Sequence, residues 1–396
     1  MSYNKKSYAL GSVRSVIRET FEYGKKRSAE IGAENVFDFS LGNPSVKPPK
    51  EVSESIKELL LTCDETTLHG YTSAQGDASV RQTIADNIKE RFNVNIDKDL
   101  IYMTCGAAAS LSICLNAVIN NGDECIVFAP FFTEYRVFVE NAGGVLVVSK
   151  PEDMTFQIDL DNFESLITDK TKAIILNSPN NPSGVVYTED KIKAVAKILS
   201  EKQMEYGHPI YLISDEPYRE LVYGDVHVPY LMNYYDNTFV CYSFSKSLSL
   251  PGERIGYIAI NPNMQEAKTL YLAVCGAGRA LGYVCAPSLF QRVVAKCINS
   301  KTDIETYKRN RDTIYNILTE IGYECVQPDG AFYLFVKALE DDANKFCENA
   351  REFELLLVPC DGFGVKGYVR VSYCVAYDTI VNSLPAFKKL KEKYSK

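Results

Sequence analysis

Short runs of almost purely apolar residues alternate along this chain with segments of helical periodicity, and this alternation limits the fold more than any other feature. The runs lie at residues 124–129, 173–176, 211–214, 240–242 and 255–260. Between them apolar residues recur every four positions, as at Val80, Ile84 and Ile88, which is typical of one helix face. Strands that are apolar on both sides need helices over both faces of their sheet. The pattern therefore predicts an α/β fold whose mostly parallel sheet is flanked by helices.

The chain changes character near residue 300. Its 396 residues are too many for one compact core, so we expect about two domains. Residues 304–321 have the pattern of one long helix, and short strand-like runs follow at residues 331–336 and 368–373. We predict a large domain over residues 45–300 and a smaller α+β domain over residues 301–396. Residues 1–44 are expected to form an N-terminal segment that contributes to the small domain.

Composition narrows the classes of partner. With 43 basic and 51 acidic residues the net charge is -8, which disfavours binding to nucleic acid. No stretch approaches the roughly 20 apolar residues needed to span a bilayer, so no membrane partner is expected. The twelve cysteines include no C-x-x-C pair, and the three histidines are scattered. We therefore expect no metal site or disulfide scaffold, and a reducing cytoplasm suits the chain better.

Four of the apolar runs end in polar segments, at the edge of the sheet where α/β proteins form their ligand sites. These segments are N-S-P-N-N-P-S-G at 177–184, D-E-P-Y at 215–218, S-F-S-K at 243–246 and P-G-E-R-I-G at 251–256. Each is a weak signal alone, since N-P-S-G is an ordinary turn. Their order and spacing together are specific.

In combination the four segments resemble the class I/II aminotransferases, the aspartate aminotransferase-like branch of fold type I enzymes that use pyridoxal 5'-phosphate (PLP). The resemblance extends from F-S-L-G-N-P at 39–44 to Y-V-R at 368–370. It implies the fold type I architecture, PLP bound in the large domain, and a homodimer with shared active sites. It also implies amino transfer between an L-amino acid, aspartate-like or aromatic and neutral, and a 2-oxo acid such as 2-oxoglutarate.

The resemblance assigns the reactive groups to three segments. Lys246 matches the lysine that holds PLP as a Schiff base and moves the substrate proton. Asp215 matches the carboxylate that pairs with the protonated pyridine nitrogen, which keeps the ring able to accept electrons. Tyr218 and Asn181 match the pair that hydrogen-bonds the phenolic oxygen and so lowers the pKa of the neighbouring imine.

The remaining matches concern binding of the cofactor and the substrate. A helix start and a guanidinium are suited to a phosphate, and Tyr71 resembles the tyrosine that reaches the phosphate of the neighbouring subunit. Phe132, with Phe131 beside it, matches the aromatic that stacks on the pyridine ring. Arg370 matches the clamp on the substrate α-carboxylate, assisted by Gly42 and Asn181. The expected phosphate ligands are Gly106, Ala107, Ala108, Ser243, Ser245 and Arg254.

Two differences from the family pattern leave the identity of the substrate undetermined. Cys360 replaces the glycine usual in the P-G-x-x-F-G segment, and alanines occupy residues 107–109, where some bacterial aspartate aminotransferases carry a lysine. Arg279 lies where other members supply an arginine for a distal carboxylate from the partner subunit, but it could equally be a solvated or interface arginine. A PLP lyase of the carbon–sulfur type, or a cyclopropane-forming synthase, would use the same lysine and aspartate. A non-catalytic relative is disfavoured by the complete set of reactive residues.

Overall fold

A computed structural model describes residues 2–12 and 15–395 of the chain. A seven-stranded sheet forms the centre of its larger part. Its strands run in the order β2-β8-β7-β6-β5-β3-β4, and β8 alone is antiparallel to its neighbours. This confirms the expected α/β class with a mostly parallel sheet. The strands are β2 (Ile101–Thr104), β3 (Glu124–Phe128), β4 (Val145–Ser149), β5 (Thr171–Asn177), β6 (Tyr211–Glu216), β7 (Thr238–Ser243) and β8 (Gly256–Ile260).

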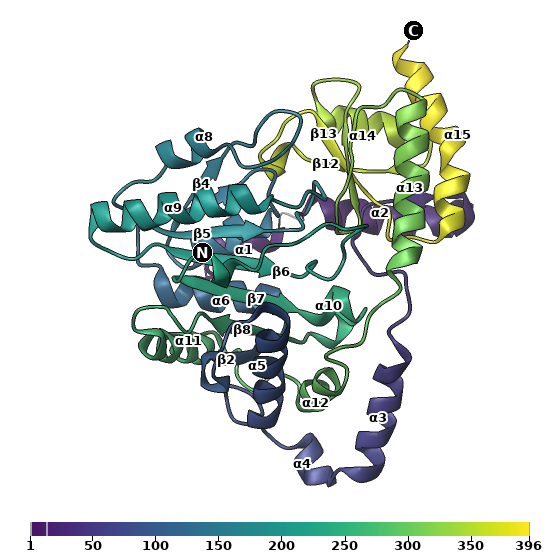
Figure 1. Cartoon of the computed structure of the whole chain (residues 1–396). Coiled ribbons are helices and arrows are strands. Elements are labelled where there is room, and N and C mark those ends of the chain that lie inside the picture. The colour runs from purple at the N-terminus through teal and green to yellow at the C-terminus, as the bar shows by residue number, and fades with distance from the viewer. Residues whose placement is uncertain (1, 13–14, 396) are drawn as a thin grey trace.

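Helices cover both faces of this sheet (Figure 1). In β3, Cys125 and Val127 join the hydrophobic core on one face, whereas Ile126 and Phe128 join the core on the other. Successive strand residues point to opposite faces, so an all-apolar run needs both layers. On the first face lie α5 (Ala78–Phe92), α6 (Ala107–Val118), α7 (Glu134–Asn141), α11 (Ala267–Leu281) and α12 (Ser288–Lys296), and on the second lie α8 (Leu160–Ser165) and α9 (Glu189–Tyr206).

A second sheet, of four antiparallel strands, lies near the C-terminal end of the chain. Its order is β12-β13-β10-β9, and it shares a hydrophobic core with the neighbouring long helices, which lie side by side in Figure 1. The strands are β9 (Cys325–Val326), β10 (Tyr333–Lys337), β12 (Val358–Pro359) and β13 (Tyr368–Ser372), and the helices are α13 (Ile304–Glu320), α14 (Ala343–Arg351) and α15 (Tyr377–Tyr394).

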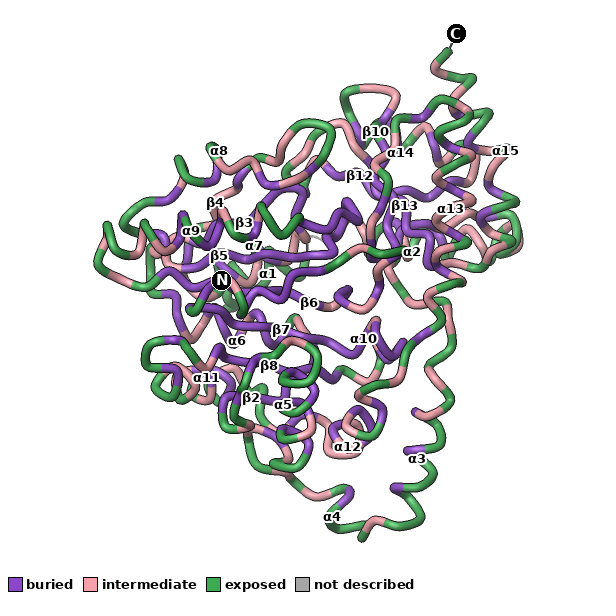
Figure 2. The backbone as a smooth tube through the Cα atoms, viewed as in Figure 1, coloured by how far each residue is buried: buried purple, intermediate pink, exposed green. Residues whose placement is uncertain are grey.

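The start of the chain runs to this second region. β1 (Phe37–Asp38) pairs in parallel with β11 (Leu355–Leu356), which follows α14. The expected role of residues 1–44 and the domain boundaries at 44 and 300 remain predictions. Before β1 come α1 (Lys5–Ser12) and α2 (Val16–Ile31), and after it α3 (Lys50–Thr62) and α4 (Glu65–His69), whose arm is largely exposed in Figure 2.

The remaining elements are short. A single turn of helix, α10 (Phe244–Ser247), follows β7 directly and carries Lys246. Within the described chain, no helix has both the length and the apolar content required to cross a membrane. The 3-10 turns are η1 (Ala33–Asn35), η2 (Lys98–Leu100), η3 (Leu231–Asn233), η4 (Pro251–Glu253) and η5 (Asp361–Phe363).

Candidate active site

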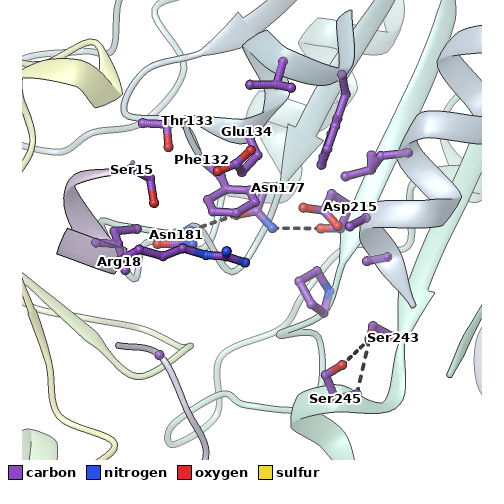
Figure 3. A pocket seen from close by; sticks show the side chains of 18 of the residues that line it. Ser15, Arg18, Phe132, Thr133, Glu134, Asn177, Asn181, Asp215, Ser243 and Ser245 are labelled. Carbon is purple, nitrogen blue, oxygen red and sulfur yellow. Dashed lines mark hydrogen bonds between the residues drawn. The ribbon is translucent and has the colours of Figure 1, made fainter. Parts of the chain in front are cut away.

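A cavity of about 1000 Å³ opens at the carboxyl ends of the central strands. Asn177 ends β5, Asp215 is the penultimate residue of β6, and Ser243 ends β7, and all three line the cavity. Ligands of α/β proteins bind outside the carboxyl ends of the parallel strands, where polar side chains gather. Figure 3 shows these residues facing the same space as side chains from α2 and α7.

Lys246 lies in this cavity on α10. Its Nζ donates a hydrogen bond to the carbonyl oxygen of Gly42 at 2.6 Å. Burial is the main cause that lowers the pKa of the Lys246 ammonium to about 8, and the nearby cations Arg254 and Arg370 contribute to this shift. The neutral, nucleophilic form of the amine is therefore far more populated near physiological pH than it would be for an ordinary lysine.

Asp215 is 5% exposed and has one oxygen without a partner. Its Oδ2 accepts a hydrogen bond of 2.5 Å from the Tyr135 hydroxyl, whereas Oδ1 has no partner among the described residues. Burial raises the pKa of this carboxyl to about 7. A buried carboxylate oxygen without a donor is costly. A cationic N–H donor at Oδ1 would satisfy this oxygen and stabilise the charged carboxylate, and the protonated pyridine nitrogen of PLP would be such a donor.

Two tyrosines and an asparagine stand beside Asp215. The hydroxyls of Tyr218 and Tyr333 lie 2.9 Å apart. The backbone N–H of Asn181 donates to Oδ1 of Asn177 at 2.8 Å, which fixes the loop after β5. Tyr333, on β10 of the second sheet, was not expected from the sequence.

The other end of the cavity combines a helix start, a cation and hydroxyls. Gly106 has a φ of 90° before α6, and a Cβ there would lie 2.8 Å from Nη2 of Arg254. Nη1 of Arg254 donates to Oγ of Ser245 at 3.4 Å, and Oγ of Ser243 accepts from the Ser245 N–H at 3.2 Å. Ala107 and Ala108, at the start of α6, also line the cavity. These groups suit a phosphate dianion.

Arg370 reaches the cavity from β13 and is 2% exposed. Its guanidinium donates to Oδ1 of Asn181 at 3.0 Å and to the carbonyl of Ser40 at 2.6 Å, while Nε has no partner among the described residues. A Cβ at Gly42 would lie 2.0 Å from the Tyr333 hydroxyl, so only glycine fits there. Arg370 is therefore held in place with donor capacity to spare, which suits a carboxylate.

Phe132 and Phe131 are separated clearly by the structure. Phe132 lines the cavity, and its ring stands edge-on to that of Tyr135 at 5.8 Å. Phe131 is 2% exposed, and its N–H donates to the carbonyl of Phe363, away from the cavity. Phe132 is thus the aromatic available to a bound ring.

Three other predicted residues lie outside the cavity of this chain. Tyr71 is 98% exposed, and Arg279 is exposed on α11. Their proposed action on a neighbouring subunit remains a prediction. Cys360 is fully buried, and burial raises the pKa of its thiol, so it is not a reactive thiolate. In the described part of the chain, no three His, Cys, Asp or Glu side chains form a metal-binding group.

Several cavity residues were missed from the sequence. Ser15, Arg18 and neighbouring residues of α1 and α2 line it, as do Glu134 and Tyr333. Tyr135 supports Asp215 from behind. None of these residues stands in a recognisable motif. The only signals were a tyrosine in the strand-like run 331–336 and a cation, Arg18, near the start of a helical segment.

Comparison with known proteins identifies the family. The family model for aminotransferases of class I and II matches residues 34–382. A solved aminotransferase from Eubacterium rectale is 55% identical, with a TM-score of 0.98 and full coverage of both chains. A probable aspartate aminotransferase of Methanocaldococcus jannaschii is 31% identical over 96% of this chain and 97% of its own length. Aromatic-amino-acid aminotransferase 2 of Thermococcus litoralis is 28% identical over 96% of each.

The fold and the match across most of the chain define a PLP-dependent enzyme of fold type I. The chain belongs to the class I/II aminotransferase family, and it is a transaminase. The resemblance found in the sequence is thereby confirmed.

Proposed function

We propose that this enzyme transfers the amino group of an L-amino acid to a 2-oxo acid such as 2-oxoglutarate, and that Lys246 both holds PLP and moves the proton. The observation that carries the proposal is a juxtaposition. One cavity contains an amine of lowered pKa at Lys246, an unpaired buried carboxylate oxygen at Asp215 and a guanidinium with a free donor at Arg370.

When bound, PLP supplies an electron sink for the electrons released as the substrate Cα loses its proton. Asp215 would bind the pyridine N–H through Oδ1, held in place by Tyr135. Tyr218 and Asn181 would hydrogen-bond the phenolic oxygen, and Phe132 would cover one face of the ring. The phosphate would be bound by Gly106, Ala107, Ala108, Ser243, Ser245 and Arg254.

Arg370 would bind the α-carboxylate of the substrate, with Gly42 and Asn181 adding donors. This leaves the Cα proton near Nζ of Lys246, which is neutral at a pH above about 8 and can accept that proton. Because Arg370 and Gly42 come from the small-domain side, substrate binding could draw the two domains together and expel water. We further propose a homodimer in which Tyr71 reaches the neighbouring phosphate.

The donor and the reaction can be tested together. The holoenzyme is mixed with a panel of amino acids, and the cofactor absorbance is recorded. Conversion to the pyridoxamine form, reversed by 2-oxoglutarate, supports the proposal and identifies the donor. Release of ammonia and pyruvate without a 2-oxo acid would indicate the lyase, an alternative without support in the names of these relatives.

The role of Lys246 has its own variant. Lys246→Ala should lose at least about 10⁴-fold in rate, since both the covalent anchor and the proton carrier are removed. Lys150→Ala, an exposed lysine outside the cavity, is the matched control. Transamination by Lys246→Ala at the wild-type rate would refute the proposal.

A further inference from the structure

Arg18 is a cation of the cavity that has no role in the functions assigned above. It stands in the first turn of α2 and lines the same cavity as Asp215, Asn181 and Arg370. Figure 3 shows Arg18 reaching into this space beside Asn181, with Ser15 and Glu134 on the same side. Arg18 belongs to the same chain as the other residues that line this cavity.

The Arg18 guanidinium forms no ion pair and no side-chain hydrogen bond with any residue that the structure describes. The two other cavity arginines differ in this respect. Arg370 donates to Asn181 and Ser40, and Arg254 donates to Ser245 and Pro251. Arg18 therefore keeps its full fork of N–H donors for a ligand.

Helix stability does not explain a cation at this position. The N-terminal turn of a helix carries partial positive charge, which favours acidic side chains and disfavours basic ones. Glu19, the next residue, meets that preference for α2. Arg18 is exposed and is placed against the dipole, so helix stability gives no reason for a cation here.

We propose that Arg18 binds the distal carboxylate of a dicarboxylic substrate, from within the same subunit as the catalytic lysine. This inference rests on the proposed function. Arg370 grips the α-carboxylate on the small-domain side, and Arg18 offers a second guanidinium from α2. Aspartate, glutamate and their 2-oxo acids carry two carboxylates, which two bidentate donors fit.

Glu134 supports an alternative hypothesis, in which the cavity selects a substrate side chain of the opposite charge. It lines the cavity and stands in the first turn of α7, where the helix dipole stabilises a carboxylate. Its position is therefore explained by the helix it begins, unlike that of Arg18. If Glu134 read the substrate instead, the enzyme would prefer a cationic side chain such as that of lysine.

Arg279 offers a second competing reading. It is exposed on α11 and does not line the cavity of its own chain. It could act only in the site of a partner subunit. The variants Arg18→Gln, Arg279→Gln and Glu134→Gln separate the three readings, because each removes one charge and retains hydrogen-bonding capacity.

The experiment compares kcat/KM of the holoenzymes for L-aspartate and L-glutamate with that for L-norvaline and L-lysine. For Arg18→Gln we expect a loss of about 10- to 100-fold for the two dicarboxylic donors, the range for a lost charged hydrogen bond. L-norvaline should change less than about threefold, since it has no group to pair with Arg18. Glu134→Gln should leave the dicarboxylic donors unchanged or improve them.

A second readout is independent of turnover. Succinate, a dicarboxylate that cannot be transaminated, is titrated against the holoenzyme and followed by cofactor absorbance. Its dissociation constant should rise about 10- to 100-fold in Arg18→Gln and recover in part in Arg18→Lys, which restores the charge but not the fork.

Three outcomes would overturn the assignment. An equal loss for L-norvaline and L-aspartate would make Arg18 a merely structural residue. A selective dicarboxylate loss in Arg279→Gln but not in Arg18→Gln would assign the role to the partner subunit. A selective loss of L-lysine turnover in Glu134→Gln would show that the cavity selects a cationic substrate side chain and not a carboxylate. If the wild-type enzyme transaminated none of the four donors, the proposed function itself would fail.

Discussion

The two sides of the cavity are built in different ways. Asp215, Ser243 and Lys246 stand at or directly after the ends of buried strands, and they are tied by hydrogen bonds to neighbouring segments. On the opposite side, α1 has no buried residue, and α2 buries only Thr20 and Gly24. The groups at the strand ends are thus positioned by the core, whereas the rim formed by α1 and α2 buries few side chains. A family can keep one chemistry and change its substrates when the two are separated in this way.

After the loss expected for Lys246→Ala, the largest predicted effect tests the rigid side. Asp215→Asn should lower kcat by about 10² to 10³-fold, because an amide cannot hold the positive charge of the pyridine nitrogen. Single-turnover absorbance kinetics measures the loss. Tyr135→Phe is the graded control, and it should cost about tenfold or less, since it removes one hydrogen bond to the same carboxylate. Equal losses in the two variants would contradict the role of Oδ1.

Arg370→Lys tests the small-domain contribution to the site. Lysine retains the charge but cannot donate in the bidentate geometry, so we expect kcat/KM for every amino acid to fall about 10- to 100-fold. The absorbance spectrum of the bound cofactor should be unchanged, because Arg370 lies outside the cofactor ligands. An unaltered affinity for amino acids would refute both the clamp and the closure that depends on it.

The pH dependence tests the environment of Lys246. Only the neutral amine attacks the aldehyde of PLP, and burial lowers the pKa of Lys246 to about 8. Capture of PLP by cofactor-stripped enzyme should therefore accelerate about tenfold per pH unit below this value and level off above it. Pyridoxamine phosphate, which has no aldehyde, is the control and should not show this rise. Continued acceleration towards pH 10 would indicate an ordinary, solvated lysine.

The smallest effect is expected on the loose side. Deleting residues 2–11 should change Tm by less than about 2 °C, because α1 buries no side chain. KM for the substrate should nonetheless rise, since Ala9, Leu10 and Gly11 line the cavity. Thermal unfolding and steady-state kinetics on the same preparation separate the two effects. A large fall in Tm would show that the two sides are not as different as their burial indicates.

Most of the rigid side could be predicted from the sequence. Polar segments after apolar runs identify strand ends, and strand ends meet at one edge of a sheet. The residues that were missed depend on contacts between distant parts of the chain. Tyr333 meets Tyr218 across 115 positions, and Tyr135 meets Asp215 across 80. No local pattern encodes such a meeting.

The loose side was largely invisible to sequence reasoning. The approach of Arg18 to the cavity depends on how α2 packs, and its periodicity shows only that a helix forms. The strand β4 was also missed, although it lies at the edge of the large sheet, where Val145 is half exposed. Residues 145–148 are all apolar, so the signal for this strand was present in the sequence.

The pairing of β1 with β11 has a consequence for how the enzyme is made. Phe37 and Leu355 are partners in this ladder, so β1, which is synthesised early, cannot pair until β11 has been synthesised near the end of the chain. Gly42, which accepts the hydrogen bond from Lys246, follows that early strand by a few residues. The large sheet can therefore fold during synthesis, before the last residues of the pocket have left the ribosome. A nascent chain that stops short of Arg370 would contain Lys246 but lack the guanidinium that we propose binds the substrate carboxylate.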